Sequence, residues 1–249
     1  MIRNNGDIAT VGNGEKTSTI QFHSHAGHIV SCTPGTGNTI EFYSLESPSS
    51  ARLSLTTDTP SKQHFWSPSG STLLSYSQSN VLSIYDPRTS PSPQTTIEPH
   101  YQTSRPSHAT FLSDTTILAT GTRSTRTLTL YDLRSPLSPK LTIPFDSSTA
   151  PSVALLPLTD TTRNLGYIVQ KHSSSIYAFD FNGSNPLPTT LQLASTIVDT
   201  AILPPRNVDV MRAEINRLFV LSRRDEIIPV SVRVERKVPS RNPNIRFHP

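Results

Sequence analysis

Apolar and polar residues alternate between His64 and Arg88 in a pattern that predicts three short strands joined by tight turns. The stretch reads HFWSPSGSTLLSYSQSNVLSIYDPR. In its last part, VLSIYD, successive residues alternate between two faces, as the two-residue period of a β-strand requires. Ser69-Gly70 and Ser79-Asn80 are residues typical of the turns between such strands. The rest of the chain contains looser copies of this unit.

An aromatic residue marks the end of one strand in each of the first four copies, at Tyr43, Tyr85, Tyr131 and Phe179. The separations are 42, 46 and 48 residues, and Asp follows the aromatic residue in the last three. A repeat of roughly 40–45 residues with four strands, one of them closed by aromatic-Asp, is typical of a WD-type β-propeller. We therefore predict an all-β propeller, because each small sheet needs stacked neighbours to bury its faces.

The copies predict five blades between two polar ends. An N-terminal segment (1–18) and a C-terminal tail with Pro and Arg (238–249) lie outside the propeller (19–237). The blades are expected at about 19–47, 51–89, 94–134, 140–182 and 189–237. Between Val208 and Asn216 the sequence is compatible with either a short helix or a loop containing a turn.

Composition places the chain among soluble cytoplasmic proteins. Charged residues make up only 16% of the chain, which excludes the highly charged class of disordered proteins, and the 22 prolines fall in clusters between apolar runs. No apolar stretch approaches the roughly 20 residues needed to span a bilayer. The N-terminus lacks the apolar core of a signal peptide.

Positive charge is concentrated near the C-terminus. Residues 205–249 carry ten Lys or Arg against five Asp or Glu, an excess of +5, whereas the rest of the chain sums to −1. This excess indicates either a solvated face or attraction to an acidic protein partner. No recognisable motif of interleaved aromatic and basic residues accompanies this charge, so nucleic acid is disfavoured. The candidate partner-binding residues are Arg206, Arg223, Arg224, Arg236 and Lys237.

Catalytic, metal and cofactor sites are not predicted. His23, His25 and His28 lie close together in HSHAGH, but no Cys or acidic residue accompanies them as zinc sites usually require. The serines form no nucleophile-elbow motif. We therefore expect no enzyme activity.

Four other conspicuous residues are assigned structural roles. Asp86 and Asp132 follow the marker aromatic residues and are expected to accept hydrogen bonds in the turn at the strand end. Trp66 is expected in the blade core. Cys32 is the only cysteine, which excludes an internal disulfide, and a buried inert thiol is expected.

Several stretches resemble the coronins, which are actin-associated WD-repeat proteins. They are WSPSG…IYDPRT (66–89), RPSHATF (105–111), TG…RTLTLYDLR (120–134), SSSIYAFD (173–180) and LPPRNVDVMRAEINRLFVLSRRDEIIPVSVRVERK (203–237). The last is the most specific, because its Pro-Arg, Asp-Val, Glu-Ile and Arg-Lys pairs follow the order that closes a coronin propeller. The resemblance covers residues 18–237.

The resemblance implies a seven-bladed ring, actin-filament binding and a location on the cytoskeleton. Only five blades can be counted here, so an open or truncated ring is expected. The basic N-terminal motif that the family uses on filaments is missing. No heptads follow Lys237, so no coiled coil for oligomerisation is expected. Tandem-propeller coronins suggest an alternative, a WD-repeat scaffold in vesicle or Golgi trafficking without direct actin binding.

Overall fold

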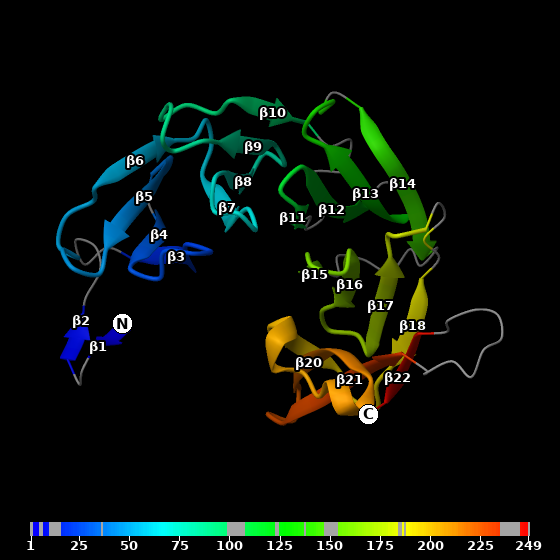
Figure 1. Ribbon diagram of the computed structural model, residues 1–249. Coiled ribbons are helices and arrows are strands. Elements are labelled where there is room, and N and C mark those ends of the chain that lie inside the picture. Colours follow the sequence, from blue (N-terminus) through cyan, green and yellow to red (C-terminus); the bar gives the residue numbers. More distant parts are fainter. Residues whose placement is uncertain are drawn as a thin grey trace. The chain divides into compact units, whose positions relative to one another are not determined.

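The computed structural model describes residues 2–4, 7–9, 16–35, 37–98, 108–122, 125–136, 138–146, 154–183, 186, 188–234 and 245–248. Most of them lie in short β-strands and turns that follow one another along the chain (Figure 1). Within these ranges a hairpin of β1 (Ile2–Asn4) and β2 (Asp7–Ala9) precedes five four-stranded sheets. No helix in this part of the chain is long and apolar enough to cross a membrane.

Each sheet is a meander in which every strand lies beside the next one in the sequence. The first sheet contains β3 (Thr17–Phe22), β4 (Ile29–Pro34), β5 (Thr39–Ser44) and β6 (Leu53–Thr56); the second contains β7 (Ser61–Trp66), β8 (Leu73–Ser77), β9 (Leu82–Tyr85) and β10 (Thr95–Ile97). The third contains β11 (His108–Ser113), β12 (Thr116–Thr122), β13 (Arg126–Asp132) and β14 (Pro139–Asp146). The fourth contains β15 (Leu155–Asp160), β16 (Leu165–Gln170), β17 (Ser175–Asp180) and β18 (Thr189–Gln192); the fifth contains β19 (Ile197–Ile202), β20 (Glu214–Ser222), β21 (Ile227–Val234) and β22 (Ile245–His248).

The chain forms two compact units. Unit 1 comprises residues 1–103, 113–117 and 130–141, and unit 2 comprises 104–112, 118–129 and 142–249. Sheets one and two therefore belong to unit 1, sheets four and five belong to unit 2, and sheet three has residues in both.

Adjacent sheets within a unit pack through their apolar faces. In unit 1, Ile40, Phe42 and Leu55 of the first sheet share one buried cluster with Leu73 and Tyr85 of the second. In unit 2, the buried cluster joins sheets four and five through Leu165, Tyr167, Val169, Ile176, Ala178, Ile197, Leu218, Val220, Val230 and Val232. Stacking is needed because one small sheet cannot bury both of its own faces.

The marker aromatic residues occupy equivalent positions, as the repeat predicts. Tyr43, Tyr85, Tyr131 and Phe179 each lie at or next to the end of the third strand of their sheet. All four side chains are buried. The interpretation of the 42–48-residue spacing as a blade repeat is therefore confirmed.

The aspartates after these aromatic residues close the strand-end turns, as expected. Asp86 Oδ1 accepts hydrogen bonds from the backbone N–H of Arg88 (3.0 Å) and from Arg88 Nε (2.9 Å). Asp132 and Arg134 repeat both contacts with the same distances. The hydrogen bond from the arginine side chain is the largest cause that lowers the pKa of each of these two carboxyl groups.

The sheets are offset by one strand from the sequence units. The segments that open the second to fifth units, found in β6, β10, β14 and β18, pair as the fourth strands of the preceding sheets. The predicted tail 238–249 supplies β22, which pairs with β21. The reason is that a periodic pattern specifies the length of the repeat but not the point at which each sheet begins.

The segment between Val208 and Asn216 forms the end of a loop and the start of β20 rather than an α-helix. Two single-turn 3₁₀ segments, η1 (Pro205–Asn207) and η2 (Val210–Arg212), are followed directly by β20. Asp209 caps the second by accepting from the backbone N–H groups of Met211 and Arg212. Of the two interpretations the sequence left open, the structure shows the loop.

Candidate interaction site

A buried carboxylate fixes the β19–β20 loop (Leu203–Ala213). Glu214 is 2% exposed and accepts hydrogen bonds from Arg217 Nε (2.8 Å) and Nη2 (2.7 Å), from Ser231 Oγ (2.6 Å) and from the backbone N–H of Asp209 (2.7 Å). Burial alone would raise the pKa of Glu214, but these donors outweigh it and lower the pKa to about 2. The loop is therefore anchored at its base to β20 and β21.

The anchored loop presents apolar and cationic side chains to solvent. Val210 is 66% exposed and Met211 is 80% exposed. Arg206 is exposed and makes no ion pair or side-chain hydrogen bond with the described residues, whereas Arg212 forms a 3.4 Å ion pair with Asp209. Exposed apolar side chains beside arginine are common in protein interfaces.

A second cationic group lies in the turn between β20 and β21. Arg223 and Arg224 are exposed, and the turn is closed by Asp225, whose φ of 59° is left-handed. The backbone N–H of Asp225 donates to the carbonyl of Ser222 at 3.1 Å. Asp225 and Glu226 share this turn, so its net charge is zero even though two guanidinium groups project from it.

Of the five candidate residues predicted from charge, the structure describes three. Arg223 and Arg224 are consecutive in the turn after β20, whereas Arg206 lies in the 3₁₀ segment η1 of the loop before it. Arg236 and Lys237 lie outside the described residues.

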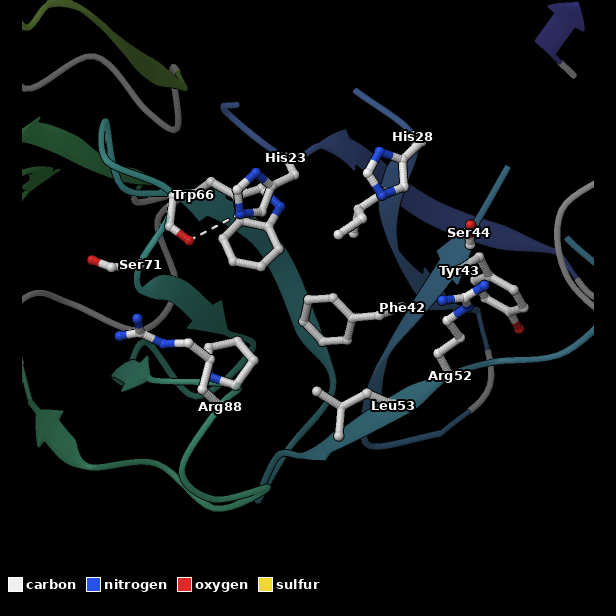
Figure 2. Close-up of a pocket in the computed structure, with 13 residues that line it drawn as sticks. His23, His28, Phe42, Tyr43, Ser44, Arg52, Leu53, Trp66, Ser71 and Arg88 are labelled. Atoms are coloured by element: carbon white, nitrogen blue, oxygen red, sulfur yellow. Dashed lines mark hydrogen bonds between the residues drawn. The ribbon is translucent and has the colours of Figure 1, made fainter. Parts of the chain in front are cut away.

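A cavity of about 290 Å³ opens between sheets one and two at the ends of their strands. Figure 2 shows Trp66 and Phe42 at its centre, with His23 above them and Leu53 below. The rings of His23 and Trp66 are 4.4 Å apart between centroids, and Phe42 meets Trp66 edge-on at 5.5 Å. Trp66 was predicted as blade core; it is partly buried and packs against the core cluster while lining this cavity.

Beside the cavity, hydrogen bonds join the His23–His28 turn of sheet one to the Ser67–Gly70 turn of sheet two. We call this set of contacts the latch. Ser24 Oγ donates to the carbonyl of Ser67 at 2.7 Å. His23 Nδ1 accepts from two backbone N–H groups, so the ring donates through Nε2 to the carbonyl of Gly70 at 3.0 Å. His25 Nε2 lies 2.9 Å from the carbonyl of Pro68.

Two of the three clustered histidines, His23 and His25, take part in this contact between the turns. Within the described ranges, no group of three or more His, Cys, Asp or Glu side chains is arranged to hold a metal ion. The rings of His23 and His25 are directed to backbone carbonyls instead.

Replacing Gly70 by alanine is expected to destabilise unit 1 by about 1–3 kcal/mol. Gly70 has a φ of +73°, and a Cβ atom there would lie 2.4 Å from Cε1 of His23. Urea unfolding followed by Trp66 fluorescence measures the effect. Gly27→Ala is the matched control, because a Cβ at Gly27 meets nothing within 4 Å; equal stability of the two variants would contradict the role of the latch.

Comparison with known proteins establishes the fold. No protein-family model matches the sequence, and no curated protein matches it significantly. Among solved structures, the WD40 domain of coronin from Toxoplasma gondii superposes on 90% of the chain with a TM-score of 0.80 and 22% sequence identity. A chain of the mitotic checkpoint complex superposes on 87% with a TM-score of 0.64 and 16% identity. The chain spans 57% and 60% of these two structures. The all-β WD40 propeller fold is therefore confirmed.

Proposed function

We propose that the chain is a non-catalytic WD-repeat module that binds protein partners and associates with actin filaments in the cytoplasm. The observation that carries the proposal is the structural likeness to a coronin WD40 domain over 90% of the chain. The coronin-like segment 203–237 supports it, because the described part of this segment folds into an anchored loop and a hairpin that expose arginines at both ends of β20.

Electrostatic attraction gives the proposal its physical basis. Actin filaments are acidic, and Arg223 and Arg224 are exposed neighbours in one tight turn. Exposed ion pairs contribute roughly 0.2–1 kcal/mol each and mainly accelerate association, so their effect depends on salt. Arg206, Arg236 and Lys237 remain proposed contributors to the same binding.

Cosedimentation with filamentous actin tests the proposal. We expect the double charge reversal Arg223→Glu, Arg224→Glu to weaken filament binding roughly tenfold at low salt, because it replaces two attractive contacts by repulsive ones. The difference should shrink as ionic strength rises from about 0.01 to 0.15 M, since the Debye length falls from about 30 to 8 Å.

The control for this experiment is the double variant Lys16→Glu, Lys140→Glu. It changes the net charge equally at two exposed residues of unit 1. Equal loss of binding in both double variants would show a general charge effect instead of a specific contact. Absence of filament binding by the unmodified protein would reject the actin assignment.

A further inference from the structure

The lining of the cavity between sheets one and two carries positive charge and no negative charge. Its thirteen residues include two arginines, Arg52 and Arg88, and no Asp or Glu. Figure 2 shows Arg52 and Arg88 on opposite sides of the aromatic pair. An apolar floor with a cation on either side suits a ligand that has an apolar centre between two acidic groups.

Both arginines retain hydrogen-bonding capacity. Arg52 is exposed and makes no ion pair or side-chain hydrogen bond with any residue in the described ranges. Arg88 bonds to Asp86 through Nε and Nη2, which leaves its Nη1 unpartnered among those residues. The guanidinium group of Arg88 is thereby held in place, with 71% of the side chain exposed. Arginine in such a position recognises carboxylates well.

The size of the cavity limits what can enter it. About 290 Å³ is at the lower end of the range for ligand sites, roughly 300–1,000 Å³. One large side chain fits better than an extended cofactor. Trp66 and Phe42 already meet edge-on, and a third ring could extend that arrangement by the same edge-to-face contacts.

We propose that this cavity binds a short acidic peptide segment of a protein partner, with one aromatic side chain inserted against Phe42 and Trp66 and flanking carboxylates on Arg52 and Arg88. The proposal is independent of actin association, because it uses residues of unit 1 and none of the arginines assigned to filament binding. It assigns a separate ligand and a separate site.

Trp66 provides a direct readout, because it is the only tryptophan in the chain. The probe is acetyl-Asp-Asp-Phe-Asp-Asp-amide, titrated into the full chain while Trp66 fluorescence and the single indole N–H resonance in a ¹H–¹⁵N spectrum are recorded. We expect a saturable change in both signals. Replacing Phe by Ala in the peptide, or its four Asp residues by Lys, should weaken binding at least tenfold.

The matched variants are Arg88→Gln and Arg134→Gln. Arg134 makes the same contacts with Asp132 that Arg88 makes with Asp86, and its side chain is 73% exposed, but it does not line the cavity. We expect Arg88→Gln and Arg52→Gln each to weaken peptide binding about tenfold and Arg134→Gln to leave it unchanged. No saturable change in either signal, equal binding of the Lys-containing peptide, or equal effects of Arg88→Gln and Arg134→Gln would overturn the proposal.

Discussion

Replacing Arg217 by methionine is expected to destabilise unit 2 by about 1–3 kcal/mol, the cost of leaving a buried acceptor without its partner. The side chain of Glu214 is 1% exposed, whereas that of Arg217 is 34% exposed. Removing Arg217 therefore leaves a buried carboxylate without its two charge-assisted hydrogen bonds. Urea unfolding followed by circular dichroism measures the loss, because Trp66 reports only on unit 1.

A double-mutant cycle separates this mechanism from simple loss of packing. The double variant Arg217→Met, Glu214→Gln should be more stable than Arg217→Met alone, since it no longer buries an unpaired charge. If the two substitutions were simply additive, Glu214 would not depend on Arg217, and the anchor of the β19–β20 loop would have another origin.

Lowering the pH should remove the contribution of ionised Glu214 to the free energy of unfolding of the unmodified protein. Its pKa is about 2 in the folded state against 4.5 as the ordinary value, so the unfolded state binds more protons between these pH values. The stabilisation is complete above about pH 4.5 and is lost as pH falls towards 2. At roughly 1.4 kcal/mol per pH unit the loss reaches about 3 kcal/mol, and it should be smaller in Arg217→Met.

The strands and their repeat were predictable because the relevant information is local. Alternation within VLSIYD specifies which side chains share a face of a strand, and the recurring aromatic residues specify the period. The place where each sheet begins is different, because β6 pairs with β5 in sheet one although its sequence opens the second unit. That pairing depends on which hairpin forms, and the period contains no such information.

The short strand β22 could not be predicted from the sequence pattern. The four residues of β22 have too few alternations to be distinguished from a polar tail, yet they pair with β21 over the register Ser231↔His248 to Val234↔Ile245. A strand of this length is recognisable only through the neighbour with which it pairs.

The candidate sites were predictable only in part. Net charge pointed to Arg206, Arg223, Arg224, Arg236 and Lys237. A charge count does not say where residues lie, and Arg206 lies in the loop before β20 whereas Arg223 and Arg224 lie in the turn after it. The cavity was missed because its lining comes from strand ends that are up to 65 residues apart, from His23 to Arg88. Trp66 was assigned to the core, and it does pack against the core cluster, but it also lines the cavity.

Lowering the pH from 7 to 4 is expected to destabilise unit 1 through a single buried histidine. His64 on β7 is 1% exposed; its Nδ1 lies 2.9 Å from Thr19 Oγ1 and 3.0 Å from Thr33 Oγ1, and its Nε2 lies 2.9 Å from Ser31 Oγ. These hydroxyl groups belong to sheet one, so the neutral ring joins the two sheets. Burial disfavours the charged ring and lowers the pKa of His64 from 6.5 to about 4.

The pH range follows from which state binds more protons. Between pH 6.5 and 4 the unfolded chain protonates His64 while the folded chain does not, so stability falls as pH decreases through this interval. The loss is complete near pH 4 and amounts to about 3 kcal/mol at roughly 1.4 kcal/mol per pH unit. Urea unfolding at a series of pH values, followed by Trp66 fluorescence, measures it within unit 1.

Two histidine variants decide whether His64 is responsible. His64→Gln cannot be protonated, so it should lack most of the decline in stability between pH 6.5 and 4. Its amide can hydrogen-bond the hydroxyl groups but does not have the shape of the imidazole ring, so the variant should be less stable than the unmodified protein at pH 7. His28→Gln is the control, because His28 is exposed and its ring makes no hydrogen bond with the described residues. If His28→Gln abolished the decline, or if His64→Gln retained it in full, the acid sensitivity of unit 1 would come from groups other than the histidine that joins its two sheets.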